Sequence, residues 1–407
     1  MTTLKSLVLV GAGHANAQLL KHFIDHPDPR VSITVVTPTT LAPYSGMVPG
    51  WLSGAYDFSE ICIDFNALAR AANAALRLDE IASLDPDRQI ARLSSGSELF
   101  YDVLAVNVGS TLRPPSLQDG RLLSLRPLGR LRNVWDGLLD ELRLNESQQP
   151  LVVTAVGGGA AGIEAVLASV AKLRALQPGR DIAGRLVTRS SDILPGFPRR
   201  TKSLARLALQ RCGISVVTNT EFTPEFEKDS DIVLWATGAQ AHDWHSASGL
   251  KLSDRGFIQV DRYLRSVSHS NVFAVGDCAE WSEPLPKAGV YAVRMGPYLT
   301  HNVRVALNSG GVLREYRPQR HFLVLLATGD GRAIGSRGRV GLGASALIGK
   351  LMWRWKDHID RTFIDQFRLE DHASAKTGRL FVQDRSGRRV APAEQPRISK
   401  ASSADKA

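Results

Sequence analysis

Two glycine-rich turns, each between an apolar run and a helical pattern, could bring the backbone against a phosphate. The first reads Val10-Gly11-Ala-Gly13-His14-Ala15-Asn16. Gly11 allows a tight turn, Gly13 lets the backbone approach a pyrophosphate, and the next helix N-terminus faces that anion. Asn16 stands where a third glycine or alanine is usual, so this match to the dinucleotide fingerprint is partial. Taken alone, it fits a plain strand-to-helix turn as well as a cofactor site.

The second turn has the complete spacing of the fingerprint. It reads Val156-Gly157-Gly-Gly159-Ala-Ala-Gly162-Ile-Glu164, after an apolar strand and before a helix. All three glycines and both flanking patterns agree, so a dinucleotide site is favoured here over a packed turn. The two turns together predict two dinucleotide sites.

Neither turn is followed by the carboxylate that usually holds a ribose hydroxyl at the end of the second strand. That position reads Val36-Thr37-Pro38 after the first turn and Leu186-Val-Thr-Arg189 after the second. Arg189 can pair with the 2′-phosphate of NADP, or it can be a solvated loop residue. The second nucleotide is therefore written NAD(P)H, with a slight preference for NADPH.

A third motif, Asn271-Val-Phe-Ala-Val-Gly276-Asp277-Cys278, ends an apolar strand in Gly-Asp. A carboxylate at the carboxyl end of a strand lies where ligands bind in open α/β sheets, so Asp277 could accept hydrogen bonds from a polyol or a ribose. The three cysteines, Cys62, Cys212 and Cys278, have no CxxC spacing, which argues against a disulfide framework or a zinc cluster. No metal site is expected.

The elements that position these motifs are repeated. A strand, a glycine turn, a helix and a second strand follow one another over residues 7–36 and again over 151–188, which is the unit of a parallel sheet. Further strands are expected at 103–106, 215–218, 231–235 and 271–275, and helices at 64–73, 128–144, 287–307 and 346–368. The turn Gly329-Asp-Gly331 predicts a hairpin over 321–340. The fold class is therefore α/β.

Length and composition fit a globular chain of two or three domains, because 43% of the 407 residues are hydrophobic and 22% are charged. The formal charge of +10 suits anionic ligands, but no basic stripe interleaved with aromatics marks a nucleic-acid site. No apolar run reaches the ~18 residues of a membrane span, and the first residues read as a strand rather than a signal segment. A cytoplasmic protein is expected.

In their order, the motifs resemble those of the pyridine nucleotide-disulfide oxidoreductase superfamily. In its members, one glycine turn stands at the start of an FAD domain and another at the start of an inserted NAD(P)H domain. An ATG strand end closes the insert, and a VFAxGD strand returns to FAD. The counterparts in this chain are Gly11 and Gly13, Gly157 to Gly162, Ala236-Thr237-Gly238, and Gly276-Asp277.

The resemblance implies two Rossmann-like, three-layer dinucleotide-binding domains, with the NAD(P)H domain inserted in the FAD domain. The expected divisions are an FAD domain at 1–113 and 262–320, an NAD(P)H domain at 114–261, a small C-terminal region at 321–383 and a disordered tail at 384–407.

The resemblance also implies hydride transfer from NAD(P)H to FAD that requires no catalytic side chain. The residues expected around FAD are Gly11, Gly13, His14, Ala15, Thr37, Pro43, Gly109, Gly276 and Asp277. Those expected around NAD(P)H are Gly157, Gly159, Gly162, Glu164, Arg189, Thr237 and Gly238. The loop at Pro43-Tyr44 should lie near the flavin, and Glu164 on the nicotinamide side.

Within the superfamily, the sequence resembles type II NADH dehydrogenases, and more closely the flavoprotein domain that precedes selenide, water dikinase in fusion proteins. The second likeness rests on residues 11–15, 41–50, 291–297 and 353–360. Two features depart from relatives. The redox cysteine pair of disulfide reductases is missing, and Val290 and Met295 replace the two glutamines of the dehydrogenases. The electron acceptor, a quinone or another small molecule, therefore stays open.

The C-terminal run at 347–355 interleaves Trp and Leu with Lys and Arg. Such a run is expected first to pack on the protein's own core or to form a homodimer face. Peripheral contact with the cytoplasmic membrane face is the second expectation.

A different class of function also stays open, a flavoprotein partner or sensor linked to selenium metabolism with little turnover of its own. Reduction of the flavin by NAD(P)H separates an enzyme from such a partner.

Overall fold

The computed structural model describes residues 4–117, 121–144, 147–308, 310–319, 322–338, 340–343, 345–369, 382–383 and 389–390. The chain divides into two units, Met1–Arg368 and Leu369–Ala407. In the second unit β21 (Val382–Gln383) pairs antiparallel with β22 (Arg389–Val390). The rest of 384–407 lies outside the described residues, and all that follows concerns the first unit.

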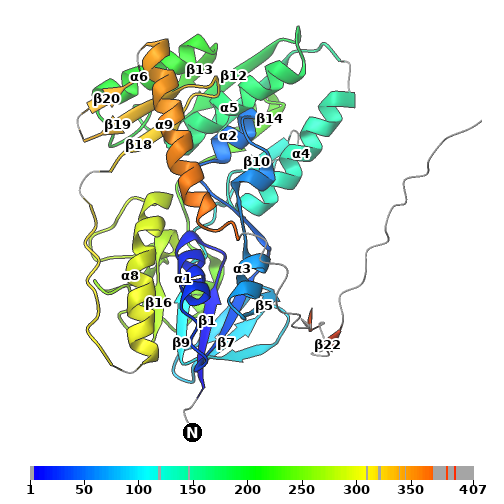
Figure 1. Ribbon diagram of the computed structural model, residues 1–407. Coiled ribbons are helices and arrows are strands. Elements are labelled where there is room, and N and C mark those ends of the chain that lie inside the picture. Colours follow the sequence, from blue (N-terminus) through cyan, green and yellow to red (C-terminus); the bar gives the residue numbers. More distant parts are fainter. Residues whose placement is uncertain are drawn as a thin grey trace, which may run out of the picture. The chain divides into compact units, whose positions relative to one another are not determined.

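A parallel sheet with the strand order β16-β9-β1-β2-β5 carries the first glycine turn. Its strands are β1 (Lys5–Val10), β2 (Val31–Thr37), β5 (Ala75–Leu78), β9 (Val103–Val106) and β16 (Val272–Ala274). The helices α1 (His14–Asp25), α3 (Phe65–Ala71) and α8 (Gly289–Leu307) pack together on one face (Figure 1). The other face packs on the antiparallel strands β6 (Ile81–Asp85), β7 (Ile90–Leu93) and β8 (Glu98–Phe100).

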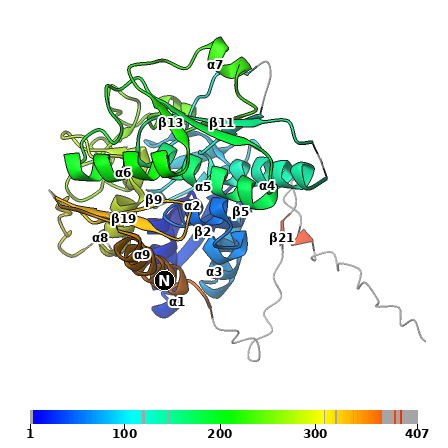
Figure 2. The same cartoon turned by 90° about the horizontal axis from the view of Figure 1, so that it is seen from above.

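A second parallel sheet, in the order β10-β14-β11-β12-β13, carries the second turn. Its strands are β10 (Arg121–Ser124), β11 (Leu151–Val156), β12 (Ile182–Val187), β13 (Ile214–Val217) and β14 (Ile232–Trp235). The crossovers from β10 to β13 all advance in one direction, so right-handed connections place their helices on one face. Figure 2 shows α4 (Leu128–Leu144), α5 (Ala160–Leu176) and α6 (Arg199–Arg211) side by side there. The predicted α/β class is confirmed.

Short elements lie in the connections between the larger ones, among them the long segment after β2. They are β3 (Leu41–Pro43), α2 (Val48–Ser53), β4 (Cys62–Asp64), α7 (Pro224–Lys228), β15 (Ile258–Gln259) and β17 (Ala279–Glu280). The sequence patterns did not predict β10 or α6. In α6 the buried apolar side chains are only Leu204, Ala205 and Leu209, too few for a clear helical pattern.

The chain returns to the first sheet earlier than the division at 261 implies. Leu250, Ile258 and Val260 belong to the buried cluster that contains Val8 of β1. An antiparallel bridge between Thr111 and Gln240 marks the crossing. The segment after about residue 240 therefore packs with the first sheet, although the motif order placed it in the insert.

The C-terminal region of this unit is a three-stranded antiparallel sheet and one long helix. The predicted hairpin is present as β18 (Val324–Ala327) and β19 (Ala333–Arg337), and β20 (Val340–Leu342) adds a third strand. The helix α9 (Ala346–Asp365) starts at this sheet and extends toward α1 (Figure 1). Among the described residues, no helix is long and apolar enough to cross a membrane.

Buried charges attach α9 to the segment that follows β2. Lys356 and Asp360 form an ion pair of 2.6 Å, and both side chains are only 7% exposed. The Lys356 ammonium also donates to the carbonyl of Gly46. The Tyr56 hydroxyl donates to Asp357, the residue after Lys356, at 2.7 Å. These contacts fix α9 against the segment between β3 and β4, because a buried ammonium needs every available acceptor.

We expect Asp360→Ala to lower the free energy of unfolding by about 3–5 kcal/mol, because the Lys356 ammonium would stay buried without its carboxylate. Urea denaturation measures the change. Asp365→Ala is the control, since Asp365 pairs with Arg368 at the exposed end of the same helix and should contribute less than about 1 kcal/mol. Equal losses in the two variants would contradict the attachment described above.

Candidate functional site

Asn107 is the residue on which the first glycine turn closes. It follows β9, its side-chain Nδ2 donates to Val275 O at 2.9 Å, and its Oδ1 accepts from Ala15 N at 3.0 Å. A methyl group at Gly13 would lie 2.1 Å from Asn107 Oδ1, and one at Gly11 would lie 2.6 Å from Asn107 O. Close packing therefore requires glycine at both positions, as the fingerprint predicts.

Asn16, which breaks the fingerprint, has a structural role. It is fully buried, and its Nδ2 donates to the carbonyls of Val10 at 3.1 Å and Gly11 at 2.9 Å. These bonds hold the strand end against the first turn of α1. The helix itself begins after Gly13 with no side-chain cap, so its N-terminal N–H groups and its dipole suit an anion.

The other residues expected around FAD border the same sheet edge. Thr37 ends β2, is buried, and donates its hydroxyl to Thr39 O at 3.0 Å. Gly109 follows β9 with φ +71 and open space beside it. Pro43 ends β3, which pairs with β4 nearby in the chain. Gly11, Thr37, Gly109 and Gly276 thus all follow or end parallel strands at their carboxyl ends, where ligands bind in such sheets.

Asp277 is engaged by an arginine that the sequence analysis did not single out. Arg126, in the loop after β10, donates Nη1 to Asp277 Oδ2 at 2.6 Å and also to the Ser110 hydroxyl. The Asp277 side chain is 11% exposed. Arg126 lies between β10 and α4 of the second sheet, so this pair joins the β10–α4 loop to the Gly276-Asp277 turn. No spacing signal marks Arg126, because its partner is far away in sequence.

The second glycine turn closes on backbone rather than on a side chain. Gly157 has φ +121, and a methyl group there would lie 2.3 Å from Ala236 O. A methyl group at Gly162 would lie 2.0 Å from Gly157 O. Gly159 caps α5 without a side-chain hydrogen bond and has open space beside it, which leaves the helix N-terminus accessible. This is the geometry that binds a pyrophosphate.

Arg189 follows β12 at the edge of this turn and is solvent-exposed. It forms an ion pair with Glu221, with Nη1 and Oε1 3.6 Å apart and both side chains more than 70% exposed. Such a pair holds the guanidinium weakly, so it can turn to another anion. Thr237 and Gly238 follow β14, beside the Gly157 turn, and Gly238 is exposed.

His14 lies among aromatic rings instead of in an open loop. Its ring centroid is 5.1 Å from that of Tyr44 and 5.7 Å from that of Phe363 on α9, both edge-to-face. Burial lowers the pKa of His14 to about 4, so the imidazole is neutral. Burial and the nearby Asp360 carboxylate raise the pKa of Tyr44. Two residues expected near the flavin, His14 and Tyr44, are thus brought together.

Glu164 lies one turn into α5 and is half-buried against the C-terminal sheet. Its Oε1 accepts from Ala327 N, in β18, at 2.8 Å. Burial raises the pKa of Glu164 to about 7, and the Lys356 ammonium opposes that rise. A carboxyl group with such a pKa can hold or release a proton near neutral pH.

The three cysteines are free and occupy separate places. Cys278, next to Asp277, is fully buried and donates its thiol to Val275 O at 3.2 Å; burial raises the pKa of this thiol to about 11. This agrees with a packing role. Within the described residues, no group of three or more His, Cys, Asp or Glu could hold a metal ion.

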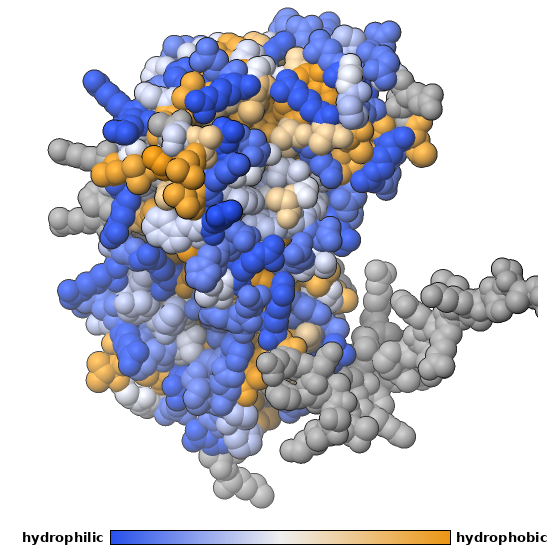
Figure 3. Space-filling model, turned by 45° about the horizontal axis from the view of Figure 1, so that its top comes forward, coloured by the Kyte–Doolittle hydropathy of each residue, from blue (hydrophilic) through white to orange (hydrophobic). Residues whose placement is uncertain are grey.

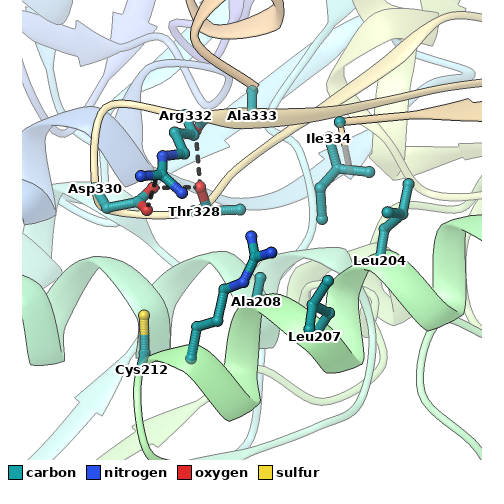
Figure 4. Close-up of a pocket in the computed structure, with 11 residues that line it drawn as sticks. Leu204, Leu207, Ala208, Cys212, Thr328, Asp330, Arg332, Ala333 and Ile334 are labelled. Carbon is teal, nitrogen blue, oxygen red and sulfur yellow. Dashed lines mark hydrogen bonds and ion pairs between the residues drawn. The ribbon is translucent and has the colours of Figure 1, made fainter. Parts of the chain in front are cut away.

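A small pocket between α6 and the β18–β19 turn does not qualify as the site. Figure 4 shows Leu204, Leu207 and Ile334 around it, with Thr328 bonded to Asp330 at 2.6 Å near its rim. Its volume of about 30 Å³ holds little more than a water molecule. The two glycine turns, with open helix N-termini, remain the places where a large ligand fits.

Two parallel sheets with a glycine turn at the carboxyl edge of each define an oxidoreductase of the two-dinucleotide class. The chain belongs to the pyridine nucleotide-disulphide oxidoreductase family, whose model matches residues 5–296. It is an FAD-dependent NAD(P)H oxidoreductase, and it is similar to NADH dehydrogenases of type II.

Curated relatives and solved structures agree with this membership. The chain is 25% identical to ferroptosis suppressor protein 1 of Taeniopygia guttata over 63% of this chain and 70% of that protein. It is 26% identical to demethylphylloquinone reductase NdbB of Synechocystis over 72% of this chain and 76% of that protein. The sulfide:quinone oxidoreductase of Aquifex aeolicus has the same fold, with a TM-score of 0.69 at 16% identity over 89% of this chain and 91% of that one.

We expect Gly13→Ala to lose most of its bound FAD, because the added methyl group would displace the Asn107 amide that the turn closes on. The ratio of flavin to protein absorbance after purification measures this. Gly137→Ala on α4 is the control, since a methyl group there meets nothing within 4 Å. Full FAD content in Gly13→Ala would show that the turn does not contact the cofactor closely.

Glu164→Gln should change how stability depends on pH. In the native protein Glu164 keeps its proton up to about pH 7, whereas the unfolded chain releases it near 4.5. Because the native state binds the extra proton, wild-type stability falls as pH rises through this window. Glutamine does not titrate, so the variant does not lose stability in this way as pH rises. The difference in Tm, variant minus wild type, should therefore increase from about pH 5 to about pH 8. A difference that does not vary with pH would contradict the shifted pKa.

Proposed function

We propose that the protein transfers hydride from NAD(P)H to FAD and passes the electrons on to a quinone. The observation that carries this proposal is the pair of glycine turns, each closed by contacts that exclude any side chain, at the carboxyl edges of two sheets. The connection bearing Arg126 reaches from the second sheet to Asp277 at the first. Two dinucleotides held at these edges would approach one another.

FAD, when bound, supplies a carrier for two electrons. On this proposal, the α1 N-terminus at Gly13 to Ala15 takes its pyrophosphate, and Asp277 accepts hydrogen bonds from its polyol chain. Arg126, which already bonds Asp277 and Ser110, adds positive charge beside the phosphates. Thr37, Pro43, Gly109 and Gly276 would line the same cradle.

NAD(P)H would bind through the α5 N-terminus at Gly157 to Gly162, with Thr237 and Gly238 on the opposite side of the nucleotide. Arg189 would meet the 2′-phosphate of NADPH. Glu164 would lie on the nicotinamide side, where its raised pKa lets it hold a proton close to the transfer without taking part in it. The buried Lys356 and Asp360 would help to keep water out of this region.

Relatives support a quinone as the acceptor, since one curated relative is a demethylphylloquinone reductase and one similar structure is a sulfide:quinone oxidoreductase. The resemblance to type II NADH dehydrogenases implies that Val290 and Met295 replace two glutamines. Met295 is buried, and its sulfur accepts from Gly276 N at 3.3 Å. The proposed acceptor must therefore be recognised by other residues.

One face of α9 supports peripheral contact with a membrane. Its inner face packs on the protein, but Leu347, Leu351 and Trp355, spaced by four residues, are 70%, 49% and 45% exposed. Lys350 and Arg354 lie between them in the helix. Figure 3 shows apolar side chains gathered among hydrophilic ones on the visible face. An apolar stripe with flanking cations suits an anionic lipid surface, and a homodimer face is the alternative.

Anaerobic mixing with NADPH should bleach the flavin absorbance near ~450 nm. Arg189→Ala should weaken the apparent affinity for NADPH about tenfold, because it removes one charge-assisted contact, and should leave NADH nearly unchanged. Stopped-flow absorbance with each nucleotide measures both effects. A flavin that stays oxidised with both nucleotides would overturn the proposed activity and favour a sensing or partner role.

A further inference from the structure

A pocket of about 410 Å³ lies among α1, α8, the end of α9 and the segment after α8. Its size is within the range of small-molecule sites. Its lining residues are Gln18, Val293, Arg294, Pro297, Tyr298, Tyr316, Arg317, Gln319, Phe363 and Gln366. None of the residues expected around either dinucleotide lines it, so it is separate from both proposed nucleotide sites.

The pocket adjoins the first glycine turn. Gln18 lies one helical turn after His14 on α1, and its Nε2 donates to Val293 O of α8 at 2.8 Å. Phe363, which lines the pocket, has its ring centroid 4.8 Å from that of Tyr44 and 5.7 Å from that of His14. One layer of aromatic rings therefore separates the pocket from the turn at which FAD is proposed to bind.

The charged side chains that line the pocket, among the described residues, are both arginines. Arg294 is exposed and has no ion pair within the described part of the chain, whereas Arg317 bonds Glu315 at 3.2 Å. The Tyr298 and Tyr316 rings meet edge-to-face with centroids 5.2 Å apart. Three glutamine amides and the arginines supply hydrogen-bond donors around these aromatic walls.

We propose that this pocket binds the electron acceptor and selects one that combines an aromatic carbonyl system with a negative charge. Arg294 would meet the negative charge, the tyrosine and phenylalanine rings would pack against the ring system, and the glutamine amides would donate to carbonyl oxygens. This proposal rests on the proposed oxidoreductase function and names the class of its acceptor.

The overall reaction balances without another reactant. NAD(P)H gives a hydride, which carries two electrons and one proton, and the solvent gives a second proton. The quinone gains both electrons and both protons, its two C=O groups become C–OH groups, and NAD(P)⁺ is released.

The test compares two quinones on the FAD-loaded full-length protein. The anionic probe is 1,4-naphthoquinone-2-sulfonate and the neutral one is menadione. Arg294→Gln should lower kcat/KM for the sulfonate about tenfold through KM, since a hydrogen bond to a charged group is lost, and should change menadione less than about twofold. Arg304→Gln, an exposed arginine further along α8 and outside the pocket, is the matched control and should change neither.

An unchanged kcat/KM for the sulfonate in Arg294→Gln, or an equal loss for both quinones, would overturn the proposal. Failure of the proposed function gives a different result, namely a flavin that NAD(P)H does not reduce. In that case the pocket is tested by equilibrium binding of the sulfonate to the oxidised protein, measured through the quenching of intrinsic fluorescence. Binding should then weaken about tenfold in Arg294→Gln and not in Arg304→Gln, and equal binding in all three proteins would overturn the proposal.

Discussion

The packing of the first glycine turn and of the Gly276 turn around Asn107 is the constraint on which the first dinucleotide site depends. A methyl group at Gly11, Gly13 or Gly276 would come within 2.9 Å of an Asn107 atom. The same amide bonds the start of α1 and the end of β16. One buried side chain therefore fixes three strand ends and a helix N-terminus relative to one another, which is what a bound pyrophosphate needs.

The second site reaches a similar geometry by other means. Backbone oxygens of Ala236 and Gly157 occupy the space that side chains at Gly157 and Gly162 would fill. The third glycine of this fingerprint, Gly162, is required because Gly157 O would lie 2.0 Å from a methyl group there. The first site has Asn16 at the corresponding position, and its amide bonds the carbonyls that the turn leaves open. This difference explains why one fingerprint is complete and the other is not.

The C-terminal helix joins the two halves of the site through buried polar groups. Lys356 reaches the carbonyl of Gly46 in the segment between β3 and α2, while Glu164 of the second turn accepts from Ala327 in β18, a strand of the sheet on which α9 packs. Burial makes each of these groups depend on its partner. The helix thus contributes one wall of the region between the turns, and with Phe363 it also contributes a wall of the pocket that opens beside His14.

Local patterns in the sequence were enough to predict the two strand–turn–helix units, the hairpin at 321–340 and the long helices, because apolar periodicity and glycine spacing depend only on neighbouring residues. The resemblance to a known superfamily supplied the pairing of the glycine turns with Gly276-Asp277. Neither could identify Asn107, Arg126 or Lys356. Their partners lie far away in the chain, at Ala15, Asp277 and Gly46, so only the packing of the sheets and of α9 decides their roles.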